Sequence, residues 1–289
     1  MNHGRRVRPL RSPVMGGYQY YEFLAVDRPL TAAEQDEVGQ FSAGAKVTDT
    51  GFVSEYHTGG FHADPGHLMR RYYDVHVYLT SWGTRRLMLR LPRAVLDPGL
   101  ARRYCVDDQV AVLAAGEHVL VDLTSEDESG EVSAEDVINE LAGLRAELAA
   151  GDLRPLYLAW LAAYGTWERD EDAFEPDDEN EVEPPVPPGL GSLTGAQRAL
   201  AGFLRLDADL LEVAAEASPA AGGAEESLAA GIAGLPAGEK DRLLLLVARG
   251  RGEQVRLELL GGARDITSQR TVAHLLDAAA LARQRGISR

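Results

Sequence analysis

The stretch DVHVYLTSWGTRRLMLRLP, residues 74–92, decides how the fold is interpreted. Two runs within it, 74–80 and 85–91, alternate between apolar and other side chains, which is typical of β-strands with one buried face. The residues between them, 81–84 (SWGT), include a glycine and suit a short loop. We therefore expect a β-hairpin. Its apolar face consists of Val75, Val77, Leu79, Leu87, Leu89 and Leu91.

The residues before this hairpin predict alternating strands and helices. Residues 18–26 (YQYYEFLAV) are apolar and aromatic on both faces, as in a central strand. Thr31, followed three residues later by Glu34, forms a capping-box pattern that opens a helix. A second strand is expected over 46–56, and a short helix over 66–72.

The residues after the hairpin complete a first domain. Runs at 109–113 and 118–123 predict a second hairpin, and two helices follow, at 133–150 and after Asp152. Strand, helix, strand, helix and then antiparallel strands predict an α+β fold with a ferredoxin-like antiparallel sheet. We expect this domain to span residues 16–166.

A change in composition marks the end of that domain. Residues 168–183 hold ten acidic residues and one arginine, a net charge of −9, and the proline-rich string EPPVPPGLG begins at residue 183. Like charges beside prolines predict an extended linker, which we place at 167–192. Capped, amphipathic runs then predict a small all-α bundle over 193–289. Residues 1–15 are basic, without the apolar stretch of a signal peptide, and are expected to form a disordered tail.

Composition narrows the possible function classes. The formal net charge of −16 argues against a nucleic acid or an anionic membrane as partner of the whole surface. The single cysteine, Cys105, excludes an intrachain disulfide and a zinc site built on several cysteines. No apolar run is long enough to span a bilayer, so we expect a cytoplasmic protein.

Common catalytic and cofactor motifs are missing from the sequence. It contains neither a phosphate-binding G-x-x-x-x-G-K-[ST] loop nor a G-x-S-x-G nucleophile elbow, and we expect no cofactor. His57, His62 and His67 are evenly spaced, but the glycines and the proline among them predict a loop, so a solvated segment is favoured over a metal site. An active site assembled from distant single residues would leave no motif, so an enzyme stays possible.

Several strings resemble a known group of proteins. They are YQYYEFLAVDRPLT (18–31), RRYYDVHVYLTSWGTRRLMLRLP (70–92), GDLRPLYLAWL (151–161) and EPPVPPGLG (183–191). They resemble a widespread, actinobacterial-type bacterial family of conserved proteins of unassigned function. The resemblance implies a cytoplasmic bacterial protein and supplies no catalytic residues.

One charged region stands out from the acidic background. Residues 70–103 contain eight arginines and two aspartates, a net charge of +6. Proteins that bind single-stranded nucleic acid do so with cations and with rings that stack on the bases, as on this sheet face. Arginines also form strong hydrogen bonds with a carboxylate-rich partner. Alternatively, these arginines pair with acidic residues of the same chain. The candidate binding residues are Arg70, Arg71, His76, Tyr78, Trp82, Arg85, Arg86 and Arg90.

Two functions follow from these patterns. The first is a non-catalytic protein-interaction module, an adaptor or scaffold in a bacterial cytoplasmic complex. The second is a nucleic-acid-binding protein that uses the arginine-rich hairpin face. Strong overall acidity counts against the second, because it weakens association with a polyanion.

Overall fold

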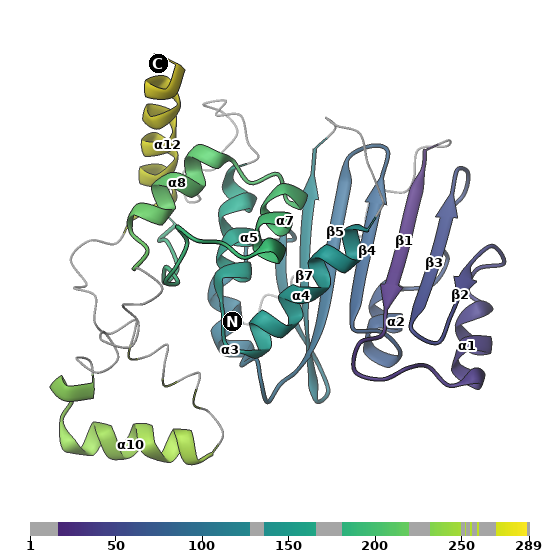
Figure 1. The fold of residues 1–289 in the computed structure, drawn as a ribbon, viewed down its shortest axis with the longest axis horizontal. Coiled ribbons are helices and arrows are strands. Elements are labelled where there is room, and N and C mark those ends of the chain that lie inside the picture. Colours follow the sequence, from purple (N-terminus) through teal and green to yellow (C-terminus); the bar gives the residue numbers. More distant parts are fainter. Residues whose placement is uncertain are drawn as a thin grey trace, which may run out of the picture. The chain divides into compact units, whose positions relative to one another are not determined.

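The computed structural model describes residues 17–127, 136–165, 181–219, 232–249 and 270–287, together with residues 252, 255 and 259 (Figure 1). These residues form one seven-stranded sheet and a set of α-helices, which confirms the mixed α+β class. The predicted basic tail lies outside the described residues, as do the start of the helix predicted from residue 133 and most of the acidic run.

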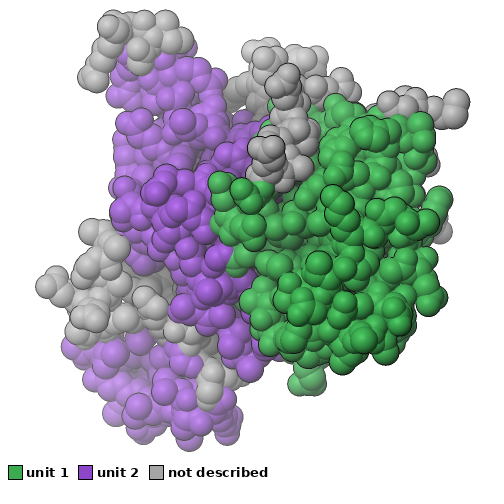
Figure 2. Space-filling model, turned by 45° about the vertical axis from the view of Figure 1, so that its right-hand side comes forward, with its two compact units in different colours: residues 1–91, 106–142 green, residues 92–105, 143–289 purple. Residues whose placement is uncertain are grey.

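The chain divides into two compact units whose bounds differ from the expected domains (Figure 2). Unit 1 comprises residues 1–91 and 106–142, and unit 2 comprises residues 92–105 and 143–289. Residues 92–105, between the first hairpin and the second, therefore belong to unit 2, although the hairpins belong to unit 1. Composition could not predict this assignment, because residues 92–105 carry no linker signal.

The sheet lies in unit 1, and its spatial order is β2-β3-β1-β4-β5-β7-β6. The strand pairs β2–β3, β3–β1, β1–β4, β4–β5 and β7–β6 are antiparallel, so β1 lies between β3 and β4 inside the sheet. The strands are β1 (Gln19–Leu24), β2 (Lys46–Val47), β3 (Gly51–Tyr56), β4 (Val75–Thr80), β5 (Thr84–Pro92), β6 (Val110–Ala115) and β7 (His118–Glu126).

The hairpin predicted at residues 74–92 is confirmed as β4 and β5. Tyr78 lies opposite Arg86 in the ladder, and Gly83 at the turn takes a φ of 97°, which suits a residue without a Cβ. All six residues of the predicted apolar face are buried. The second hairpin, β6 with β7, turns at Gly116 with a φ of 63°.

The strand predicted over 46–56 is two short strands instead. Its middle forms a tight turn in which the Thr48 Oγ1 accepts hydrogen bonds from the backbone N–H groups of Gly51 (2.8 Å) and Thr50 (3.3 Å). A threonine hydroxyl that bonds forward to its own backbone favours a turn over a continuous strand.

One face of the sheet packs against α1 (Ala32–Gly39) and α2 (Pro65–Arg71). Both helices begin as their sequences predict: Thr31 and Glu34 form the capping box of α1, and Asp64 caps α2 ahead of a first-turn proline. A core cluster joins the face to these helices, and it includes Phe23, Val38, Phe52, Leu68, Met69, Tyr73 and Met88.

Unit 2 is helical. Its central helix, α5 (Arg154–Gly165), is buried from Pro155 to Tyr164, and α7 and α8 pack against it. Its other elements in the described part of the chain are α3 (Pro98–Ala101), a 3₁₀ turn (Arg102–Tyr104), α7 (Gly195–Phe203), α8 (Ala208–Glu216), α10 (Ala237–Ala248) and α12 (Val272–Ile287), while α4 (Val137–Ala149) spans the boundary between the units.

The described part of the predicted linker, residues 181–192, is packed and not extended into solvent. Glu183 accepts hydrogen bonds from the Tyr157 hydroxyl and from two nitrogens of Arg270 (2.8 and 2.7 Å), and Tyr104 donates to the Pro185 carbonyl (2.9 Å). An extended linker is therefore not confirmed for these residues, because the acidic side chains find partners on the neighbouring helices and prolines need no partner for an N–H.

None of the helices in the described part of the chain is long and apolar enough to cross a membrane.

Candidate functional site

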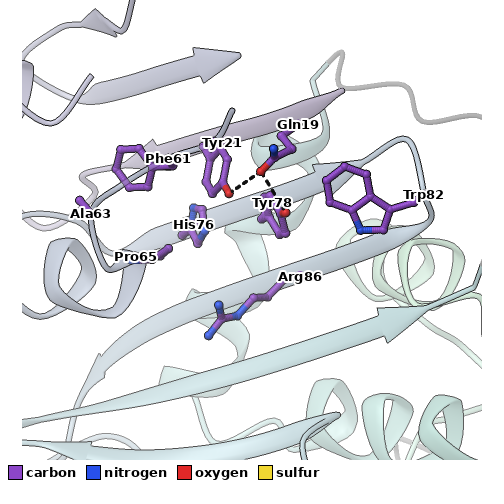
Figure 3. A pocket seen from close by; sticks show the side chains of 10 residues that line it. Gln19, Tyr21, Phe61, Ala63, Pro65, His76, Tyr78, Trp82 and Arg86 are labelled. Atoms are coloured by element: carbon purple, nitrogen blue, oxygen red, sulfur yellow. Dashed lines mark hydrogen bonds between the residues drawn. The ribbon is translucent and has the colours of Figure 1, made fainter. Parts of the chain in front are cut away.

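A pocket of about 210 Å³ opens on the face of the sheet that also carries α1 and α2 (Figure 3). Its lining comes from the neighbouring strands β1, β4 and β5, from the β4–β5 turn, and from the segment 60–65 before α2. All of these belong to unit 1. The pocket lies where the aromatic core gives way to polar side chains.

Gln19 organises the polar end of the pocket. Its Oε1 accepts hydrogen bonds from the hydroxyls of Tyr21 (3.0 Å) and Tyr78 (3.4 Å), and its Nε2 donates to the Gly59 carbonyl (2.7 Å) (Figure 3). The side chain is almost fully buried, so these bonds replace those that water would make. Gln19 thereby ties the loop before α2 to the central strand.

The two tyrosines remain neutral donors at physiological pH. Burial raises the pKa of Tyr21, and the neighbouring Tyr78 raises it further. Burial also raises the pKa of Tyr78, although its hydrogen bond with Tyr21 and the charge of Arg86 oppose the rise. Neither phenol provides a nucleophile or a base, and both present rings to the pocket.

His76 is the most unusual side chain of the pocket lining. It is 0% exposed, and its ring stacks on Phe23 with 3.9 Å between centroids. Its Nδ1 lies 2.9 Å from the Glu22 carbonyl oxygen. A carbonyl can only accept, so Nδ1 carries the proton and Nε2 is an acceptor.

That acceptor has no hydrogen-bond partner within the described residues. Burial lowers the pKa of His76 to about 3, the hydrogen bond to Glu22 opposes this shift, and the positive charge of Arg86 adds to it. The imidazole therefore stays neutral, with a lone pair on Nε2 that nothing in this part of the chain satisfies. A buried polar atom in this state costs about 1–3 kcal/mol of stability.

Arg86 forms the charged side of the pocket. Its Nε and Nη2 donate to the two carboxylate oxygens of Asp122 at 2.7 and 2.6 Å, the two-pronged geometry typical of strong arginine–carboxylate pairs. Burial acts to lower the pKa of Arg86, but the hydrogen bonds and charge of Asp122 more than offset it and the pKa is raised. Nη1 makes no hydrogen bond to the described residues.

Aromatic rings line the rest of the pocket. Tyr21 lies 5.0 Å from Phe61, centroid to centroid, and 4.5 Å from Tyr78. Trp82 closes the end near the turn, where a Cβ on Gly17 would lie 2.6 Å from its ring. Rings at these positions favour a flat, apolar body in the bound molecule.

The structure brings four of the eight candidate binding residues to this pocket: His76, Tyr78, Trp82 and Arg86. Arg90 lies on the same face and is buried, with its Nη2 2.8 Å from Oδ1 of Asp74. Arg85 lies on the opposite face of β5. Arg70 lies 3.5 Å from Asp64, and Arg71 lies 2.9 Å from Glu37. Arg70, Arg71, Arg86 and Arg90 thus each face an acidic residue of the same chain, as the intramolecular alternative expects.

Sequence reasoning missed Gln19, Tyr21, Phe61 and Asp122. The first two belong to a run that reads as a uniformly buried central strand, although a glutamine within such a run is a signal for a polar role. Phe61 belongs to the histidine-containing loop, and Asp122 lies 36 residues from its partner Arg86. No local pattern predicts those two positions.

Among the described residues, no group of three or more His, Cys, Asp or Glu side chains is arranged to hold a metal ion. Comparisons of the chain with protein-family models, with curated proteins and with solved structures found no match.

Proposed function

We propose that unit 1 is a binding domain for one small organic molecule, held in the pocket between Gln19, His76 and Arg86. The observation that carries this proposal is the buried Nε2 of His76, a residue of the pocket lining, which lacks a partner within the described residues. A ligand donor on this atom would satisfy it. Unsatisfied groups that cost stability are typical of binding sites.

Three further features support the proposal. The pocket combines a few fixed polar groups with aromatic walls, the usual composition of a small-molecule site. The hydrogen bonds of Gln19 hold Tyr21 and Tyr78 in place before any ligand arrives, which reduces the entropy lost on binding. The pair of Arg86 with Asp122 fixes the guanidinium in the same way.

Ligand-detected NMR on the full-length protein tests the proposal with a library of single-ring fragments at millimolar concentration. We expect a set of fragments to bind the wild type and to lose most of their signal with Trp82→Ala, which removes one wall of the pocket. Tyr73→Phe serves as a control, because Tyr73 is buried in the same core cluster but does not line the pocket. Fragment binding that is absent, or equal in all three proteins, contradicts the proposal.

A second candidate function is protein interaction, and α10 supports it. Leu244 and Leu245 on this helix are 66% and 58% exposed, which is unusual for adjacent leucines in a folded protein. We expect Leu244→Asp with Leu245→Asp to abolish partner capture. Leu281→Asp is the matched control, because Leu281 on α12 is 58% exposed. Capture that survives the α10 change excludes this surface.

Nucleic-acid binding ranks below both. It requires arginines that are available to neutralise phosphates, whereas Arg70, Arg71, Arg86 and Arg90 each lie beside a carboxylate. We also infer a ferredoxin-like arrangement for β1–β4, which the order β2-β3-β1-β4 with α1 and α2 between the strands supports. Membership of the actinobacterial-type family and a cytoplasmic location remain proposals that the sequence strings support.

A further inference from the structure

We propose, on the basis of the binding function above, that the ligand is an uncharged, single-ring planar heterocycle with an N–H donor next to a carbonyl oxygen, as in a lactam or cyclic ureide. The N–H would bind His76 Nε2, and the carbonyl would bind Arg86 Nη1. The two residues lie on one sheet face. His76 offers an acceptor for the N–H of the ligand, and Arg86 offers a donor for its carbonyl.

The donor on the ligand follows from the His76 tautomer. Nδ1 carries the proton and donates a hydrogen bond to the Glu22 carbonyl, so Nε2 can only accept. A ligand with only acceptors at this position would place two lone pairs against each other. The ligand therefore presents an N–H or an O–H to His76.

The acceptor on the ligand follows from the position of Arg86. Tyr78 pairs directly with Arg86, and His76 pairs with Met88, so His76 and Arg86 are diagonal neighbours on β4 and β5. Diagonal neighbours are about 7–8 Å apart at the backbone, which adjacent donor and acceptor atoms of one ring can bridge with two hydrogen bonds. Because Arg86 Nη1 is a donor only, the ring must offer it a carbonyl or similar acceptor.

That the ligand is uncharged follows from the charges of the side chains around the pocket. Asp122 already neutralises Arg86, and the charge of Asp64 also acts on this guanidinium. An anionic ligand would enter a site without a spare cation, in a chain with a net charge of −16. A cationic ligand would meet Arg86 itself. A neutral ligand avoids both penalties.

The limit to one ring follows from the size and walls of the pocket. A volume of about 210 Å³ holds a single ring with small substituents, and Tyr21, Tyr78 and Phe61 supply flat apolar surfaces near it. His76 has no exposed surface, so the segment 60–65 beside it must move outward as the ring enters. Gly59, with a φ of 79°, precedes this segment, Gly60 is its first residue, and the two glycines give the segment the freedom to do so.

The experiment is isothermal titration of the full-length protein with three probes. Uracil has the proposed edge, 1,3-dimethyluracil keeps the ring and carbonyls but lacks both N–H donors, and benzoate is a planar anion. We expect uracil to bind at least tenfold more tightly than either of the other two. His76→Phe keeps a stacked ring without the acceptor, and it should remove the preference for uracil over dimethyluracil.

Tyr73→Phe is again the control and should leave all three affinities unchanged. If dimethyluracil or benzoate binds as well as uracil, or if His76→Phe keeps the preference, the ligand class is wrong while the binding function stands. If no probe binds but other fragments do, the ligand class is likewise overturned. If no fragment of any kind binds, both proposals fail. An unfolding curve for His76→Phe ensures that a loss of preference is measured on folded protein.

Discussion

Two arginine–aspartate pairs on one sheet face differ in how completely their polar groups are satisfied. We call the pair Arg90–Asp74 the closed end of this face and the pair Arg86–Asp122 the open end. Arg86 and Arg90 stand four residues apart on β5, and each binds an aspartate through two nitrogens. At the closed end, Asp74 also accepts the backbone N–H groups of Val26 (2.7 Å) and Asp27 (2.9 Å). Arg90 donates its Nη1 to the Arg70 carbonyl (3.2 Å), so every nitrogen of this guanidinium has a partner.

At the open end the same pairing is incomplete. Arg86 bonds to Asp122 through Nε and Nη2, and its Nη1 has no hydrogen bond to the described residues. His76, which also lines the pocket, has an acceptor without a partner among these residues. Complete satisfaction of polar groups marks the closed end as structural. Incomplete satisfaction beside a cavity at the open end is what the proposed binding function expects.

The largest effect is expected at the closed end. Asp74→Asn should lower the free energy of unfolding by about 3–5 kcal/mol, because it leaves Arg90 buried without its charged partner. Urea unfolding measures this loss. Asp122→Asn at the open end should cost clearly less, because Asp122 accepts only from Arg86 among the hydrogen bonds seen. Equal losses at the two aspartates would break the distinction between the ends.

The pair Arg90–Asp74 also predicts part of the loss of folding stability at low pH. Burial acts to raise the pKa of Asp74, but the backbone hydrogen bonds from Asp27 and Val26 and the pairing with Arg90 outweigh it and lower the pKa. The stabilisation is therefore present above the pKa of about 3.9 of an unfolded aspartate, and it is lost as the pH falls through the lower folded value. Asp74→Asn should lack this acid-dependent step, and an unchanged pH profile of unfolding would contradict the assignment.

The next effect is a change of ligand preference at the open end. Asp122→Asn frees the charge of Arg86, so benzoate affinity should rise about tenfold while uracil affinity changes little. Titration with both probes measures the shift. Anion binding that stays as weak as in the wild type would mean that Asp122 does not set the charge of the pocket.

A smaller and opposite effect on stability is expected at His76. His76→Phe should raise the free energy of unfolding by up to about 1 kcal/mol. It removes an acceptor, Nε2, that has no partner among the described residues, which costs about 1–3 kcal/mol, and it loses the Nδ1 hydrogen bond to the Glu22 carbonyl, which contributes about 0.5–1.5 kcal/mol. Tyr73→Phe removes the buried Tyr73 hydroxyl, which has no partner in the described part of the chain, and should stabilise the protein by a similar amount. Only the His76 change should alter binding. A stability loss of several kcal/mol in His76→Phe would show that Nε2 has a structural partner.

The pH dependence of His76 separates it from exposed histidines. With a folded pKa of about 3 and an unfolded value near 6.5, His76 binds a proton more readily in the unfolded chain. It therefore destabilises the fold progressively as the pH falls from about 6.5 towards 3, and His76→Phe should reduce this slope. Uracil affinity should be flat between about pH 8 and 5. A midpoint near pH 6.5 would show a solvated imidazole.

The smallest effect concerns the wall of the pocket. Gly17→Ala places a Cβ 2.6 Å from the Trp82 ring, so the indole must shift. We expect a change in tryptophan fluorescence and a few-fold loss of uracil affinity, with a stability change of about 0.5 kcal/mol or less because Gly17 is only half-buried. Unchanged fluorescence and affinity would place Trp82 outside the site.

Sequence patterns predicted the parts of the fold that depend on local periodicity. The alternation in 74–92 predicted the hairpin and its two faces, and the capping box at Thr31 predicted the start of α1. The linker predicted at 167–192 is not confirmed in its described part, 181–192, because the tyrosines and the arginine that bind its glutamates lie up to 87 positions away. Composition describes a segment and not its distant partners.

The candidate site was predicted only in part for the same reason. His76, Tyr78, Trp82 and Arg86 share one hairpin, so their neighbourhood follows from the sequence. Their surroundings do not. That His76 is buried and that Asp122 neutralises Arg86 depend on β7 and on the loop before α2, which local patterns do not place.

The central claim is that His76 Nε2 is kept without a partner in order to bind a ligand. The most direct test is the difference in thermal unfolding temperature between wild type and His76→Phe, measured with and without saturating uracil. We predict that His76→Phe melts higher without uracil, and that uracil raises the melting temperature of the wild type well beyond that of the variant. A wild type that is the more stable protein without ligand, together with equal shifts in both, would contradict the account.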